Sequence, residues 1–245
     1  EHSGSAELPV QDQGVMVLLV GPEGAELRRT PLFDAERNHR ELDLRVRLSA
    51  DGTAQLQARE EIRGSAAAEY RNTYQAPGTR KERFERSLAS LYPGAELLSL
   101  SFDSLDELER PVKLRYRARV PQMARRDGDE LRLAPSVLND LLRNLARSPS
   151  RRYPLELGAP RSYLEERLVQ LPTGMRATDL PAGGEAVSEF GRLKLALQGS
   201  EGELRTSTLF EITRDRISPE QYPAFRRWVE EADMLLRQSV GVVER

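Results

Sequence analysis

Cysteine is absent from the 245-residue chain, and histidine occurs only at His2 and His39. The absence of cysteine excludes disulfides, thiolate nucleophiles and every metal site with thiolate ligands. Only two imidazoles are left that could act as the base of a nucleophile–histidine pair. We expect His2 at a frayed chain end and His39 in a polar linker beside Asn38, both exposed and without a chemical role.

The sequence also has no excess of one charge and no long apolar run. Lys and Arg number 37 against 39 Asp and Glu, for a formal net charge of −2. A nucleic-acid-binding protein would carry a basic excess gathered on one face. The longest apolar run, residues 15–20, is far shorter than the ~18 residues of a membrane helix. We therefore predict no nucleic-acid partner and no membrane span. Phosphate-loop and dinucleotide motifs are missing too, so we predict no cofactor.

Alternation of apolar and charged residues is the clearest pattern that is present. Over residues 41–48, Leu and Val alternate with Glu, Asp and Arg, which is typical of a strand with one face in water. Gly52 follows in a turn that requires a positive φ. Residues 15–20 read as a buried strand that returns over residues 25–30. Further strands are predicted at 56–62, 97–102, 112–120 and 131–133, and at about 162–171, 174–180, 185–190, 192–198 and 203–214.

Four helices are predicted between these strands. Ser65 should cap a helix over residues 66–74, a Thr79–Glu82 capping box should open a second, and Ser136 should cap a third that reaches Leu145. The last helix follows Ser218 and Pro219. It carries Trp228, which we interpret as a partly buried anchor; a ligand platform is the alternative.

These elements predict a β-rich α+β fold, with antiparallel sheets stacked as a sandwich, packed helices and a C-terminal amphipathic helix. The Ser-Pro-Ser-Arg-Arg stretch at 148–152 is the best candidate for a boundary. We predict a linker and strand tail at 1–38, a β-rich α+β lobe at 39–150, and a β-sheet lobe with a C-terminal helix at 151–245.

A basic ladder on the strand at 112–120 is the one candidate interaction surface. Lys113, Arg115, Arg117 and Arg119 share the polar face of this strand. Such a ladder can bind an acidic partner. The alternative is cross-strand pairing with carboxylates, for which the charged strand at 41–47 offers partners.

Carboxylates occur in pairs, but none predicts a catalytic or metal site. The pairs are Glu60–Glu61, Glu165–Glu166 and Glu230–Glu231, with a further cluster of Asp103, Asp106, Glu107 and Glu109. Burial could fit such pairs for acid–base chemistry, as in a hydrolase. Their polar surroundings favour solvated surfaces instead. The cluster lacks the ligand spacing and central glycine of a calcium loop.

The order of landmarks resembles the C-terminal region of bacterial secreted or periplasmic transglutaminase-like proteins. In these proteins, domains of unknown function flank a papain-type catalytic core. The landmarks are Leu8-Pro9, Gly14, residues 18–20, Pro31, Asn38, Asp51-Gly52, Gly64, Arg71, residues 92–94, Tyr153-Pro154, Leu171-Pro172, Gly174, Leu180-Pro181, Tyr222 and Phe225.

The resemblance implies that residues 1–38 continue from an upstream core that holds the catalytic Cys, His and Asp. The chain itself would then be a non-catalytic accessory module, outside the cytoplasm, that binds or positions the core or its protein substrate. A free-standing interaction module of the bacterial cell envelope is the main alternative, and a hydrolase built on carboxylates is the second.

Overall fold

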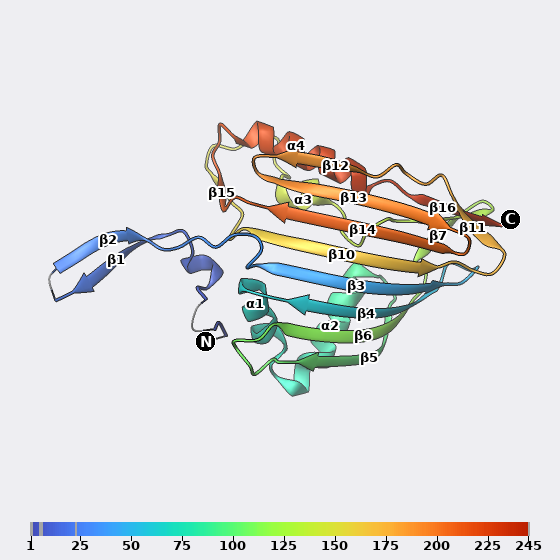
Figure 1. Cartoon of the computed structure of the whole chain (residues 1–245), viewed down its shortest axis with the longest axis horizontal. Coiled ribbons are helices and arrows are strands. Elements are labelled where there is room, and N and C mark those ends of the chain that lie inside the picture. Colours follow the sequence, from blue (N-terminus) through green and yellow to red (C-terminus); the bar gives the residue numbers. More distant parts are fainter. Residues whose placement is uncertain (1, 5–6, 23, 245) are drawn as a thin grey trace.

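A computed structural model describes residues 2–4, 7–22 and 24–244. Its main feature is an eight-stranded sheet with the strand order β12-β13-β14-β10-β3-β4-β6-β5 (Figure 1). The strands are β3 (His39–Leu48), β4 (Ala54–Ile62), β5 (Glu96–Asp103), β6 (Val112–Val120), β10 (Arg161–Gln170), β12 (Gly184–Ser188), β13 (Gly191–Ser200) and β14 (Glu203–Ile212).

Side-chain alternation gives this sheet one apolar face and one charged face. On β3, Leu42, Leu44 and Val46 are buried, and the residues between them are exposed or half-buried. The same period of two holds on β4 and β6. Because neighbouring strands keep their apolar residues in register, the inner face is continuous and forms the core.

The sheet consists of two four-stranded halves joined through β3 and β10. Within each half all neighbours are antiparallel, whereas β10 runs parallel to β3 from Ser162 opposite His39 to Gln170 opposite Arg47. The sheet is therefore mixed, and the prediction of antiparallel sheets fails at the pairing of β3 with β10. Hydrogen bonding is continuous across the predicted boundary near residue 150, so both lobes contribute to one sheet.

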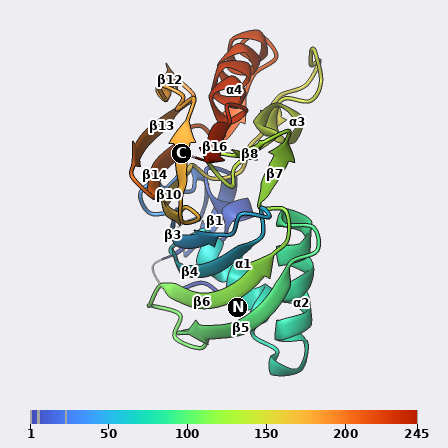
Figure 2. The ribbon, with the colours of Figure 1, turned by 90° about the vertical axis from the view of Figure 1, so that its right-hand side faces the viewer.

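Helices cover the inner face of each half (Figure 2). They are α1 (Ser65–Tyr74) and α2 (Pro77–Leu91) on one half, and α3 (Leu141–Leu145) and α4 (Tyr222–Leu236) beside the other. Phe84 of α2 packs against Tyr116 of β6 with ring centroids 5.1 Å apart. On α4, the Trp228 ring stacks on Phe210, and its Nε1–H donates to the Ala186 carbonyl oxygen. Trp228 thus anchors the helix as predicted, but it is fully buried instead of partly buried. Within the described residues, no helix is long and apolar enough to cross a membrane.

Three smaller sheets and a short 3₁₀ helix complete the fold. Their elements are β1 (Met16–Gly21) with β2 (Gly24–Arg29); β11 (Met175–Thr178), β16 (Val240–Glu244), β8 (Glu130–Leu133) and β7 (Ala124–Asp127); β9 (Leu155–Glu156) with β15 (Arg216–Ile217); and η1 (Val10–Asp12). The fold is β-rich α+β, as predicted.

None of the four predicted caps lies directly before its helix. Gly64, with φ +64°, precedes α1, while the Ser65 hydroxyl donates to the Asn38 amide oxygen. Helix α2 begins earlier, at Pro77, where the ring fixes a helical φ. Helix α3 begins only at Leu141 and is five residues long, although the Ser136 hydroxyl oxygen accepts the Leu138 amide at 3.1 Å. Before α4 the predicted Ser218–Gln221 hydrogen bonds do form, at 3.1 and 3.3 Å, but the helix begins only at Tyr222.

Gly52 is a position where the backbone requires glycine. Its φ is +83°, and a Cβ there would lie 2.3 Å from the Ala124 carbonyl oxygen. We expect Gly52→Ala to lower the free energy of unfolding by about 2 to 3 kcal/mol, through left-handed strain and this backbone clash. Gly78→Ala is the matched control, since a Cβ there meets nothing within 4 Å and the site is helical. We expect it to stabilise by about 0.5 kcal/mol. Urea denaturation followed by circular dichroism measures both, and equal effects would contradict the argument.

Candidate functional site

The four cations of the predicted ladder all lie on the outer face of β6, opposite the helices. Three of them contact carboxylates on neighbouring strands. Lys113 lies 3.1 Å from Glu61 on β4, whereas Arg115 and Arg119 lie 3.7 and 3.6 Å from Asp103 and Glu96 on β5. These are the cross-strand pairs of the alternative interpretation, but their partners come from β4 and β5 instead of the strand at 41–47.

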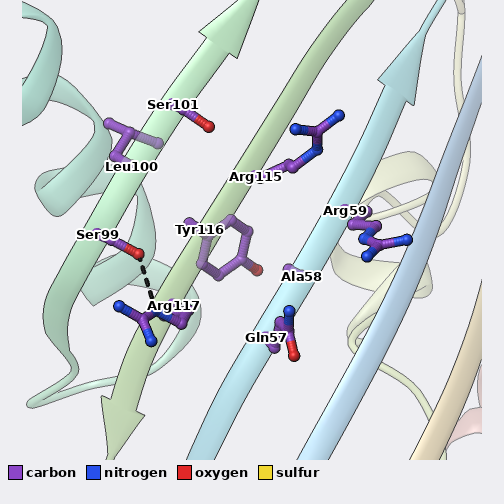
Figure 3. Close-up of a pocket in the computed structure, with 9 residues that line it drawn as sticks. All are labelled: Gln57, Ala58, Arg59, Ser99, Leu100, Ser101, Arg115, Tyr116 and Arg117. Atoms are coloured by element: carbon purple, nitrogen blue, oxygen red, sulfur yellow. Dashed lines mark hydrogen bonds between the residues drawn. The ribbon is translucent and has the colours of Figure 1, made fainter.

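Arg117 differs from the other three. Its Nε–H donates to the Ser99 hydroxyl at 3.2 Å, and no ion pair of Arg117 occurs in the described part of the chain. It lines an open hollow of about 500 Å³ on the outer face. Figure 3 shows Arg117, Arg115 and Arg59 projecting from β6 and β4, beside Ser99 and Ser101 of β5. We call the hollow lined by Arg59, Arg115, Arg117, Ser99 and Ser101 the arginine hollow.

Like charges face each other in the arginine hollow. Arg59 on β4 is the direct cross-strand partner of Arg115 on β6. Like charges at directly opposed positions destabilise a sheet pair. An anionic group placed between them would relieve this repulsion and accept hydrogen bonds from both guanidinium groups. Sequence reasoning missed Arg59, because the pairing of β4 with β6 cannot be read from the residues of β6.

A second unusual surface is the β1–β2 hairpin, which projects from the body of the molecule (Figure 1). The prediction that residues 15–20 form a buried strand was wrong, because Met16, Leu18 and Val20 are 61%, 58% and 78% exposed. Leu18 lies opposite Leu27, which is 67% exposed. Directly opposed residues share one face of a hairpin. One face of the hairpin is thus apolar and open to solvent.

The carboxylate pairs on strands are split between the two faces of the sheet. The interpretation of both members as solvated was wrong for Glu60 and Glu165, which are 5% and 0% exposed. Adjacent residues of a strand point to opposite faces, so Glu61 and Glu166 face outward and their neighbours inward. The apolar residues on either side of Glu60 indicated this arrangement. On β10 they did not, because Leu164 and Leu168 share the face of Glu166.

The buried Glu60 forms an ion pair with Arg40, whose side chain is partly exposed. It accepts hydrogen bonds from Arg40 Nε–H and from the Tyr70 hydroxyl. Burial, reinforced by the nearby Glu60 charge, raises the pKa of Tyr70 well above its ordinary value. The Arg40 guanidinium also lies 5.4 Å from the Tyr163 ring centroid. These groups line a cavity of about 600 Å³ between the sheet, α1 and α2.

Neither histidine lies where the sequence suggested. His39 begins β3 and is half-buried, with Nδ1 2.7 Å from the Ser162 hydroxyl oxygen. That hydroxyl donates to the Ala35 carbonyl oxygen at 3.0 Å. The imidazole Nδ1–H must then donate to Ser162, the reverse of a base that activates a nucleophile. The carbonyl of His2 accepts a hydrogen bond from Arg71.

The carboxylate cluster at 103–109 is engaged with neighbouring groups. Asp103 lies 3.7 Å from Arg115, and Glu107 lies 3.1 Å from Arg110. Among residues 2–4, 7–22 and 24–244, no group of three or more His, Cys, Asp or Glu side chains is placed to hold a metal ion.

Comparison with known proteins gives one family match. Residues 129–240 match DUF3858, a domain of unknown function with a solved structure. The matched stretch runs from the start of β8 to the first residue of β16 and crosses the predicted boundary near residue 150. No curated protein matches the chain.

Proposed function

We propose that this chain is the non-catalytic accessory region of a transglutaminase-like protein outside the bacterial cytoplasm, and that the β1–β2 hairpin packs against the catalytic core. The observation that carries the proposal is the apolar face of the hairpin, open to solvent on Met16, Leu18, Val20 and Leu27. Contiguous exposed apolar surface of this kind marks a protein interaction site.

The construction of the hairpin supports this role. A two-stranded hairpin by itself is only marginally stable in water, and this one projects away from the large sheet (Figure 1). A partner that covers Leu18, Val20 and Leu27 would remove apolar area from water and hold both strands in register. The choice of a transglutaminase-like core as the partner rests on the resemblance of the sequence landmarks.

A titration between this chain and the separately expressed transglutaminase-like core tests the proposal. We expect micromolar or tighter binding and a change in the activity of the core. Leu18→Glu and Val20→Glu should each weaken binding at least tenfold, because each places a charge in the covered apolar face; a tenfold change corresponds to about 1.4 kcal/mol. Val187→Glu on β12, where the side chain is 65% exposed, introduces the same charge elsewhere and should leave binding unchanged.

Two results would contradict the proposal. One is an absence of binding by a cooperatively folded chain. The other is an intact parent gene that encodes no catalytic cysteine upstream, which would favour a free-standing envelope module.

The arginine hollow favours that second candidate function, in which a free-standing module recognises an acidic segment of a partner protein. We expect a hexaglutamate peptide to bind at low ionic strength and to dissociate as salt screens the charges. The double variant Arg59→Gln/Arg117→Gln should weaken this binding about tenfold. Lys194→Gln removes an outer-face cation from β13 and is the matched control. Fluorescence anisotropy of a labelled peptide measures the binding, and equal affinities for both variants would exclude the hollow as the site.

A further inference from the structure

A second cavity lies on the inner side of the sheet, where the two halves of the molecule meet. Its volume is about 350 Å³, within the range of about 300 to 1,000 Å³ that is typical of small-ligand pockets. It opens to solvent past the exposed residues Leu91, Pro93, Gln122 and Asn139. Its floor includes Val120 of β6, Leu133 of β8 and Arg167 of β10. We call it the Arg167 cavity.

Arg167 carries the polar chemistry of this cavity. The residue is 3% exposed, and its Nη1–H donates to the Ala134 carbonyl oxygen at 2.9 Å. Its Nε and Nη2 atoms are buried and have no hydrogen-bond partner among the described residues. These two nitrogens share one edge of the guanidinium group, with parallel N–H bonds. That edge matches the two oxygens of a carboxylate.

Tyr92 offers a further hydrogen bond to the same cavity. Its hydroxyl is buried without a partner among the described residues, and the residue lines the cavity beside Arg167. Burial raises the pKa of Tyr92 well above its ordinary value. The phenol therefore stays protonated at neutral pH and can donate.

The buried carboxylate two residues before Arg167 on β10 does not take the free edge of its guanidinium group. Glu165 accepts hydrogen bonds from the Ser136 hydroxyl at 2.6 Å and from the Val137 amide at 3.0 Å. No ion pair between Glu165 and Arg167 occurs within the described residues. A buried, unpaired guanidinium edge is costly, and a ligand with two acceptor oxygens would satisfy it.

We infer that the Arg167 cavity binds a carboxylate attached to an apolar body, held by Nε–H and Nη2–H of Arg167 and by the Tyr92 hydroxyl. The remaining wall is largely apolar, as Leu133, Val137 and Met123 show. Two sources present this chemistry: a free apolar acid, and the C-terminal carboxylate of a peptide that ends in an apolar residue.

Side-chain NMR of the whole chain tests the inference. The probes are benzoate with benzamide as its neutral match, and acetyl-Gly-Gly-Leu with a free or an amidated C-terminus. We expect a saturable shift of the Arg167 Nε–H resonance with at least one acid and with neither amide. A response to benzoate assigns the site to a free acid, and a response to the tripeptide acid alone assigns it to a peptide terminus. If neither acid moves this resonance at millimolar concentration, the inference is wrong.

Two variants test the proposed hydrogen-bond donors separately. Tyr92→Phe removes only an unpartnered hydroxyl, so we expect it to fold at least as well as the parent chain and to bind the acid about tenfold more weakly. Tyr153→Phe is the matched control, since Tyr153 is 80% exposed and lies outside the cavity. Arg167→Lys keeps the charge and should lose most of the affinity, because an ammonium lacks the two parallel N–H bonds. Unchanged affinity in the folded Tyr92→Phe variant, with benzoate and the tripeptide acid alike, would exclude the phenol from the site.

Discussion

Replacing Arg71 with Met should lower the free energy of unfolding by about 3 kcal/mol, because up to three carbonyl oxygens lose their donor. Arg71 lies on α1 and is only 1% exposed. Its Nη1–H donates to the His2 carbonyl, and Nη2–H donates to the carbonyls of Glu107 and Arg110. One side chain thereby joins α1 to the loop between β5 and β6 and to the segment before β1.

Two further variants separate the hydrogen bonds of Arg71 from its charge. Arg71→Lys keeps the charge but not the fork of donors, and we expect it to lose about half as much stability. Arg86→Met on α2 removes a 70%-exposed side chain paired with Glu82, and should cost less than about 0.5 kcal/mol. Urea denaturation measures all three. A loss below 1 kcal/mol for Arg71→Met would mean that water replaces the guanidinium at these carbonyls.

The strands were predictable wherever one face of the sheet is buried and the other is wet. Over β3 and β6 the alternation of Leu, Val, Tyr and Ala with charged residues follows the pleat directly. The turn at Gly52 was equally predictable, since glycine favours the positive φ of such a turn and its φ is +83°. In these segments the local pattern and the tertiary environment act in the same direction.

The pairing of distant strands was not predictable in this way. The parallel contact between β3 and β10 joins residues more than 120 positions apart, and neither strand specifies its neighbour. Periodicity predicts which residues share a face, but not which strand lies beside them. For the same reason the sequence indicated the ladder on β6 but not the contribution of Arg59 from β4 to the arginine hollow.

Burial of β1 and of the paired carboxylates was misjudged for opposite reasons. Residues 15–20 are apolar enough for a core strand, yet β1 pairs only with β2, so no layer covers it. Glu60 is charged, yet its inward position follows from the apolar residues Ala58 and Ile62 two positions away. For Glu165 the residues two positions away are Tyr163 and Arg167, so the pattern of β10 did not indicate its burial. Hydrophobicity of a short run predicts its preference for burial, whereas burial itself needs a covering layer.

Charged residues that face the core lie close to the seam, which is the pairing of β3 with β10 that joins the two halves of the sheet. Arg40 with Glu60 lies on β3 and β4, and Glu165 with Arg167 lies on β10. Burying charged groups at this seam costs desolvation energy. The Arg167 cavity opens at the same place. Ser136 and Val137, which donate hydrogen bonds to Glu165, also line the Arg167 cavity. Substitutions at Glu165 and Arg167 should therefore affect both the stability of the chain and the proposed site.

Glu165→Leu should lower the free energy of unfolding by about 3 to 4 kcal/mol, because it removes the carboxylate that lies two residues from the buried Arg167 cation on the same face of β10. It also leaves the Val137 amide and the Ser136 hydroxyl without their acceptor. Arg167→Met alone should cost about 2 to 3 kcal/mol, since Glu165 keeps its hydrogen bonds but loses the nearby cation.

The double variant Glu165→Leu/Arg167→Met is the decisive measurement. Removing both charges leaves two apolar side chains on the inner face of β10, and we expect the combined loss to be at least 2 kcal/mol smaller than the sum of the single losses. Glu166→Leu/Arg205→Met, on the outer face where Glu166 and Arg205 are exposed, is the matched cycle and should be additive within about 0.5 kcal/mol. Additive losses in the inner cycle would show that Glu165 and Arg167 are stabilised separately, Glu165 by its hydrogen bonds and Arg167 by water or a ligand in its cavity.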